Sequence, residues 1–105
     1  MATTPKNYGL DITATGTPET VGTVGTSGGM YVIHICNRNA SAVTVQLGIN
    51  SSDNAFIDSK KILNAESIGA NGSASFGPLG LNASEKIIAQ SDTLDVTFLM
   101  TGVDY

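Results

Sequence analysis

The sequence predicts an all-β protein, an antiparallel β-sandwich of the jelly-roll or Ig-like type with about seven to eight strands and an extended N-terminal arm. Short β-branched runs recur at close spacing, and turn-forming residues separate them. Ser, Thr, Asn and Gly fill about two fifths of the 105 positions. Charged residues make up only 13%, against about 25% in ordinary globular proteins. This composition is typical of a β-rich chain with many turns.

The chain is long enough for one domain with a modest core. Residues 1–19 differ from the rest, because they combine two prolines and scattered threonines with only a weak alternation of Tyr8, Leu10 and Ile12. We expect residues 1–19 to form an N-terminal arm with one short strand, and residues 20–105 to form the sandwich domain. The three alternating side chains would anchor the arm on a partner by strand addition or by filling grooves.

The next two elements run from residue 20 to the middle of the sequence. Residues 20–30 are strand-like until a turn at Ser27-Gly28-Gly29. Residues 31–49 contain two apolar runs separated by the polar stretch Asn37–Ser41, and this pattern predicts a β-hairpin. The second run alternates in polarity, whereas the first is apolar on both faces. A strand that is apolar on both faces is either central in a sandwich or covered by another subunit.

The remaining elements follow at similar spacing. Residues 56–68 fit no single period and carry Lys60 and Lys61, so an irregular edge strand is expected there. Further strands are expected over residues 73–76, where Gly77-Pro78 would end the strand, and over residues 86–90. The last strand, residues 94–100, alternates clearly. The expected core comprises Ile33, Ile35, Val43, Val45, Leu47, Phe76, Ile87, Val96 and Phe98.

The sequence offers no catalytic constellation. His34 is the only histidine and Cys36 the only cysteine, so a triad, a His–Cys pair or a His-ligated metal site would have to include His34. We interpret His34 as a structural histidine, hydrogen-bonded in or near an interface, and Cys36 as a small buried hydrophobe. We therefore expect no enzyme, no cofactor, no metal and no small-molecule substrate.

Charge and hydropathy exclude further classes. The net charge is −4, and the only basic pair is Lys60-Lys61, which argues against nucleic-acid binding. No apolar run is long enough for a membrane span, and the first residues lack the pattern of a signal peptide. Synthesis in a cytoplasm is expected. The low charge favours a protein that docks to neighbours, although neutral β-domains also exist alone.

Four segments in order carry a resemblance. They are Ile-Cys-Asn-Arg-Asn at residues 35–39, Ala-Ser-Ala-Val-Thr-Val-Gln-Leu-Gly-Ile at 40–49, Gly-Leu-Asn-Ala-Ser-Glu-Lys-Ile at 80–87, and Leu-Asp-Val-Thr-Phe-Leu-Met-Thr-Gly-Val at 94–103. Together they resemble the small β-sandwich virion proteins of tailed bacteriophages. The likeness covers about residues 21–105 and excludes most of the arm.

The resemblance implies a capsid decoration or cement protein that binds the major capsid protein in the virion, after assembly in the host cytoplasm. It also implies a homotrimer, since decoration proteins commonly occupy three-fold positions. A tail, fibre or baseplate module is the alternative, and a carbohydrate-binding sandwich is the second. The assembly interface is expected to involve Tyr8, Leu10, Ile12, Val32, His34, Leu99 and Tyr105.

Overall fold

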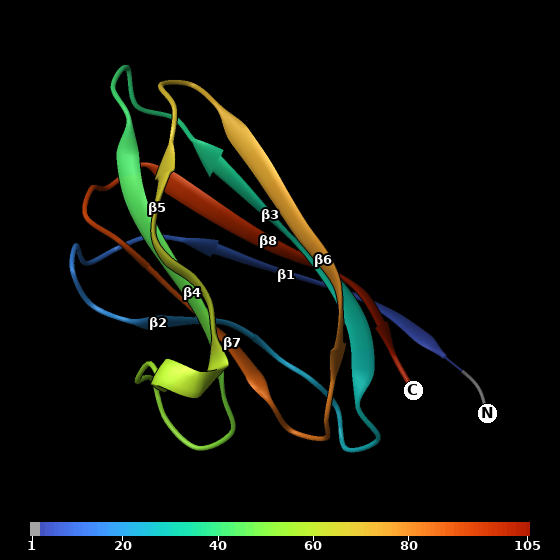
Figure 1. Ribbon diagram of the computed structural model, residues 1–105. Helices are drawn as coiled ribbons and strands as arrows, with labels where there is room; N and C mark the ends of the chain where they lie inside the picture. The colour runs from blue at the N-terminus through green and yellow to red at the C-terminus, as the bar shows by residue number, and fades with distance from the viewer. Residues whose placement is uncertain (1–2) are drawn as a thin grey trace.

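Eight strands form most of the chain in a computed structural model that describes residues 3–105 (Figure 1). They are β1 (Thr4–Asp11), β2 (Glu19–Thr23), β3 (Gly29–Asn37), β4 (Val43–Asn50), β5 (Lys61–Ile68), β6 (Ser73–Leu81), β7 (Lys86–Ser91) and β8 (Val96–Asp104). One short 3-10 helix, η1 (Asp58–Lys60), precedes β5. The prediction of an all-β chain with seven to eight strands is confirmed.

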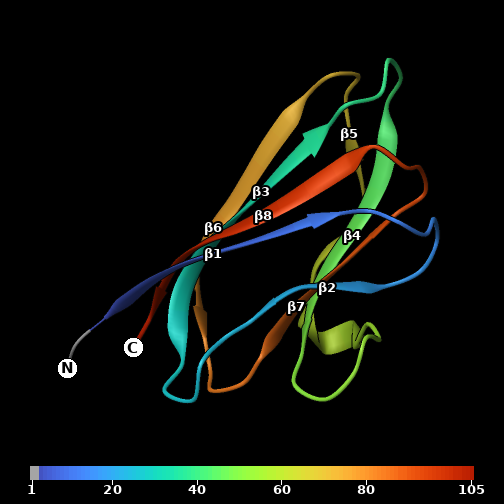
Figure 2. The same ribbon diagram turned by 180° about the vertical axis from the view of Figure 1, so that it is seen from behind.

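The strands form two four-stranded antiparallel sheets, in the orders β1-β8-β3-β6 and β2-β7-β4-β5. Consecutive strands lie in opposite sheets except for β4 and β5, which are neighbours. The sheets pack face to face as a sandwich (Figures 1 and 2). This strand order is that of the jelly roll, which resolves the choice that the sequence left open.

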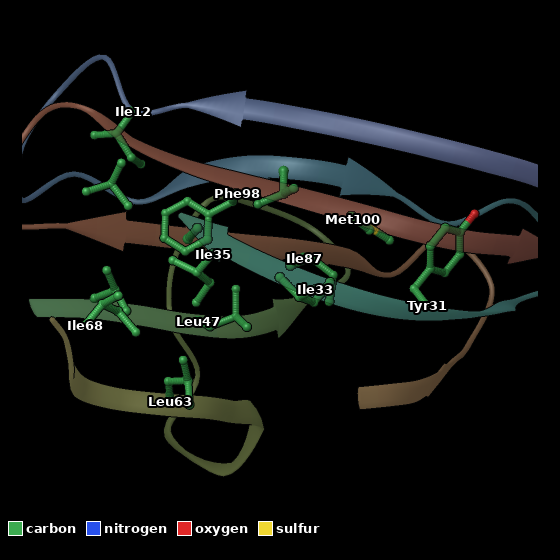
Figure 3. Close-up of a cluster of buried hydrophobic side chains, with 14 of the residues drawn as sticks. Ile12, Tyr31, Ile33, Ile35, Leu47, Leu63, Ile68, Ile87, Phe98 and Met100 are labelled. Carbon is green, nitrogen blue, oxygen red and sulfur yellow. The ribbon is translucent and has the colours of Figure 1, made fainter. Parts of the chain in front are cut away.

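The stretch from Tyr31 to Ile49 does not form the expected hairpin. β3 pairs with β6 and β8, whereas β4 pairs with β5 and β7. The apolar faces of β3 and β4 meet across the core instead, with Ile35 and Leu47 between the sheets (Figure 3). Alternation determines which face of a strand is buried but not which edge pairs, so two such runs suit a hairpin and a crossing between sheets equally well.

The expected arm is mostly an integral strand. β1 occupies one edge of the first sheet and pairs with β8 from Thr4 opposite Asp104 to Asp11 opposite Thr97. Its alternation faces inward, because Tyr8 and Leu10 pack against the core and Ile12 is only 4% exposed. The prediction of a separate extended arm is therefore wrong for this segment, although the short strand within it is confirmed. Met1 and Ala2 lie outside the described residues.

The core lies between the sheets (Figure 3). Eight of the nine expected core residues are buried, and Phe76 is half-buried against them. The cluster also contains buried hydrophobic residues that were not predicted to lie in the core: Ile12, Val21, Val24, Tyr31, Leu63, Ile68, Leu81, Ala89 and Met100.

Several strand boundaries differ from expectation. β5 is the irregular edge strand that was predicted, but it begins at Lys61 rather than near residue 56, because Asp58–Lys60 form η1. β6 continues through Gly77-Pro78 to Leu81, because an edge strand tolerates a proline and the register shifts at this point. β8 begins at Val96 rather than Leu94, which is exposed, and ends at Asp104. The strand is thus displaced toward the C-terminus but keeps the predicted alternation.

Candidate functional site

The described residues offer a surface rather than a pocket for function. Among residues 3–105, no pocket is found, and no three His, Cys, Asp or Glu side chains gather where they could hold a metal ion. None of the described helical segments is long and apolar enough to cross a membrane. The two outer faces of the sandwich are therefore the candidate surfaces for binding.

The chain itself covers part of the outer face of the β2-β7-β4-β5 sheet. Ile88 is fully buried yet lies outside the core cluster, opposite Gly48 in the register. Residues 51–60, the covering segment, pack there. A Cβ on Gly48 would lie only 2.9 Å from Cδ1 of Phe56, so this ring rests directly on the backbone of β4. Asn54 in the same segment accepts a hydrogen bond from the hydroxyl of Thr20 on β2.

The outer face of the β1-β8-β3-β6 sheet has no such cover within residues 3–105. Figure 2 shows its four strands side by side with β1 at the edge. Because Ile33, Ile35, Phe98 and Met100 point inward, the alternate residues of β3 and β8 point outward. We call this surface the open face. Its members on the two central strands are Met30, Val32, His34, Cys36, Thr97, Leu99, Thr101 and Val103.

Apolar side chains occupy much of the open face. Met30 is 43% exposed and lies opposite Val103, while Leu99 is 39% exposed and lies opposite His34. Val32 and Val103 are half-buried. Tyr105 continues the alternation of β8 beyond the strand and is 42% exposed. These residues leave hydrophobic area exposed on the open face.

Charge is almost absent from the open face. Its outward residues on β1 are Pro5, Asn7, Gly9 and Asp11, and of these only Asp11 is charged. Its carboxylate lies 2.5 Å from the Arg38 guanidinium at the end of the sheet. The centre of the face is therefore neutral, which lowers the cost of removing it from water.

His34 is held within the sheet surface by side chains of the two neighbouring strands. Its Nδ1 lies 2.8 Å from the Ser75 hydroxyl on β6, and its Nε2 lies 3.2 Å from the Thr101 hydroxyl on β8. Both ring nitrogens are thus engaged, and none of the hydrogen bonds of the described residues joins this ring to a carboxylate. The interpretation of His34 as hydrogen-bonded is confirmed. Cys36, in contrast, is exposed and not the buried hydrophobe that was expected.

A partly buried polar contact fixes the end of β8, at one end of the open face. The Tyr31 hydroxyl donates a hydrogen bond to Oδ1 of Asp104 at 2.5 Å, and the Gly25 N–H reaches the same oxygen at 3.3 Å. Burial, reinforced by the Asp104 carboxylate, raises the pKa of Tyr31, so its phenol stays protonated. This contact holds the end of β8, and with it Val103 and Tyr105.

The structure divides the expected interface residues into two groups. It brings together Val32, His34 and Leu99 on the open face, with Tyr105 at its end. Tyr8, Leu10 and Ile12 face the opposite way, into the core, because β1 belongs to the sandwich. They cannot anchor an arm on a partner while the strand stays in place.

Two apolar members of the open face are absent from the predicted interface. Met30 and Val103 lie just beyond the runs used to define their strands, and both continue the outward alternation. The alternation of apolar and polar residues, continued beyond the end of each run, includes both side chains.

Comparison of the chain with known protein families, with curated proteins and with solved structures gave no match.

Proposed function

We propose that this chain is a structural protein of a tailed-bacteriophage virion, a capsid decoration or cement protein that docks on the major capsid protein through the open face. The observation that carries the proposal is the open face itself. It is four strands wide, nearly uncharged, and carries Met30, Leu99 and Tyr105 in exposed positions. The sequence resemblance supplies the class of partner.

Physical chemistry favours a permanent neighbour for such a face. Gathered exposed apolar side chains mark association sites, and interface centres are depleted in charge. A freely soluble domain usually keeps about 25–35% charged residues on its surface, whereas this whole chain has 13%. Jelly rolls are frequent among viral capsid proteins, but lectin domains share them, so the fold alone does not decide between these classes.

The carbohydrate-binding alternative is disfavoured by the aromatic side chains. Tyr31 and Phe98 are buried, and Tyr8, Phe56 and Phe76 are half-buried. That leaves Tyr105 as the one exposed ring among the six in the sequence. A sugar site built on stacking needs a platform of exposed rings, and one tyrosine beside a flat face provides little. The tail, fibre or baseplate alternative uses the same face and differs only in the partner.

Binding to shells that lack the protein tests the proposal. Leu99→Asp places a charge at the centre of the open face, and Ser59→Asp places one on the covering segment as a matched control. We expect wild-type protein and Ser59→Asp to bind such shells and to raise their rupture temperature. We expect Leu99→Asp, shown by circular dichroism to be folded, to bind at least about tenfold more weakly, since a buried unpaired charge is costly.

Two results would contradict the proposal. Equal binding by Leu99→Asp would exclude the open face as the docking surface. Labelled protein found only at the tail would reject the capsid assignment and favour the alternative.

A further inference from the structure

The outer edge of β1 carries free backbone hydrogen-bonding groups. The Ile12 N–H donates to the Val96 carbonyl, and the β1–β8 register is unbroken before it. In an antiparallel pair, hydrogen-bonded residues alternate with residues whose N–H and C=O point the other way. The even residues of β1 therefore bond to β8, and the odd residues direct their backbone groups outward. Within residues 3–105, no strand pairs with this edge.

The other three sheet edges are interrupted. β2 carries an extra residue between Thr20 and Gly22, β5 carries two irregularities, and β6 carries one around Gly77-Pro78. Bulges and prolines of this kind protect edges from pairing with other chains. β1 alone pairs with its neighbour without a shift over all eight residues. It is the one regular edge of the described sandwich.

We propose that β1 pairs antiparallel with β1 of a second copy of this chain, so that two sheets join into one continuous sheet. Antiparallel self-pairing is self-complementary, because each copy offers the same alternating N–H and C=O groups to the other. In the register that places Asn7 opposite Gly9 of the second copy, both residues exchange backbone hydrogen bonds. Pro5, which has no N–H, then lies opposite Asp11 at the ends of the paired segment.

The side chains of β1 fit this arrangement. Gly9 has no side chain, and no atom lies within 4 Å of the position where its Cβ would stand, so nothing crowds the open-face side of this part of the edge. Lys6 and Asp11 lie toward opposite ends of the strand. In the proposed register, Lys6 lies opposite Leu10 and Asp11 opposite Pro5 of the second copy, so no like charges meet. Parallel in-register pairing would instead place each of these charges beside its own counterpart. These features favour antiparallel over parallel pairing, and a second copy supplies the same uninterrupted edge.

Amide hydrogen exchange at increasing protein concentration tests the pairing residue by residue. In the monomer, the amides of Tyr8 and Leu10 are protected by β8, while those of Asn7, Gly9 and Asp11 exchange rapidly. We expect protection of the three odd amides to rise as sedimentation shows dimers forming. Odd amides that stay unprotected while the protein associates would overturn the proposal, and so would a protein that remains monomeric.

Proline variants make the test sharper. Gly9→Pro removes an N–H that makes no bond within one copy, so the fold is expected to survive, as protected Tyr8 and Leu10 amides would show. Its dimer dissociation constant should rise at least about tenfold, since each copy loses a donor to the other. Gly9→Ala, the matched control, should change it less than about threefold. Asn7→Pro provides a second blocked edge if Gly9→Pro does not fold.

Two outcomes separate this inference from the function proposed above. Gly9→Pro that dimerises like Gly9→Ala would overturn strand pairing. A trimer, as the resemblance implies, with unprotected odd amides would assign self-association to another surface and also overturn it. Neither result requires a measurement of shell binding, so docking through the open face is tested separately.

Discussion

Truncation of Phe98 to alanine should remove more stability than truncation of any other side chain in β8. Phe98 is fully buried, and its register neighbours Leu10 on β1 and Ile35 on β3 belong to the same packed interior. Replacing a buried phenylalanine by alanine costs about 3–5 kcal/mol, through lost transfer energy and the cavity that remains. Hydrogen-bonded strands on both sides limit collapse of that cavity. We therefore expect the upper part of this range, about 4–5 kcal/mol.

Urea unfolding followed by circular dichroism measures this loss. With an m-value of about 2 kcal/mol per molar urea, a loss of about 4 kcal/mol lowers the midpoint by about 2 M. Leu99→Ala is the control, since Leu99 is the next residue on the same strand and faces outward. Its cost at concentrations below self-association should stay under about 1 kcal/mol. A loss under about 1 kcal/mol for Phe98→Ala, or equal losses for both variants, would refute the assigned faces of β8.

Three further changes test other contacts, each by urea unfolding. Tyr31→Phe should cost about 1.5–3 kcal/mol by removing the bond to Asp104. Because the folded-state pKa of Tyr31 is raised, the wild-type advantage over this variant should be complete below about pH 10 and decline above it. Asn37→Ala should cost at least about 2 kcal/mol, since this buried amide donates to three backbone carbonyls, including those of Ile68 and Gly69. Deletion of residues 2–11 should unfold the sandwich by removing β1; a stable truncated fold would restore the idea of a separate arm.

Period-two alternation made the strands and their buried faces predictable. Val43, Val45 and Leu47 alternate with small or polar residues, and all three are buried. The same rule located Val96 and Phe98 in the core. Face assignments of this kind depend on local chemistry only, because a side chain's polarity is enough to choose between core and solvent.

Pairing and connectivity were not predictable in the same way. The hairpin expected over residues 31–49 failed because the turn-like stretch between its strands also permits a crossing to the opposite sheet. The sequence of residues 1–19 indicates an arm because two prolines and scattered threonines accompany only a weak alternation. Its partner β8 lies at the other end of the sequence, so the pairing is a tertiary contact that no local pattern reports.

The candidate site was predictable in part, because the apolar character of a strand can be recognised locally but its neighbours cannot. The doubly apolar run from Tyr31 indicated a strand that is either central or covered by another subunit. β3 is central, but a central place within one sheet of a sandwich protects only its inward face. Met30 therefore remains exposed and Val32 half-exposed on the outward side. The central position accounts for the buried half of the strand, and the exposed outward half is consistent with the docking that we propose.

The two proposals are geometrically compatible. Strand pairing uses the edge of the β1-β8-β3-β6 sheet, whereas docking uses its outer face, so neither partner occupies the other's surface. Joining two β1 strands would place the two open faces on one side of a continuous sheet. A dimer would then present two docking sites to a shell, and the second contact would form at a high effective concentration. On this reasoning, Gly9→Pro should weaken shell binding even though Gly9 lies at the margin of the open face, while Gly9→Ala should bind like wild type. Equal binding by the two variants would show that single copies dock independently.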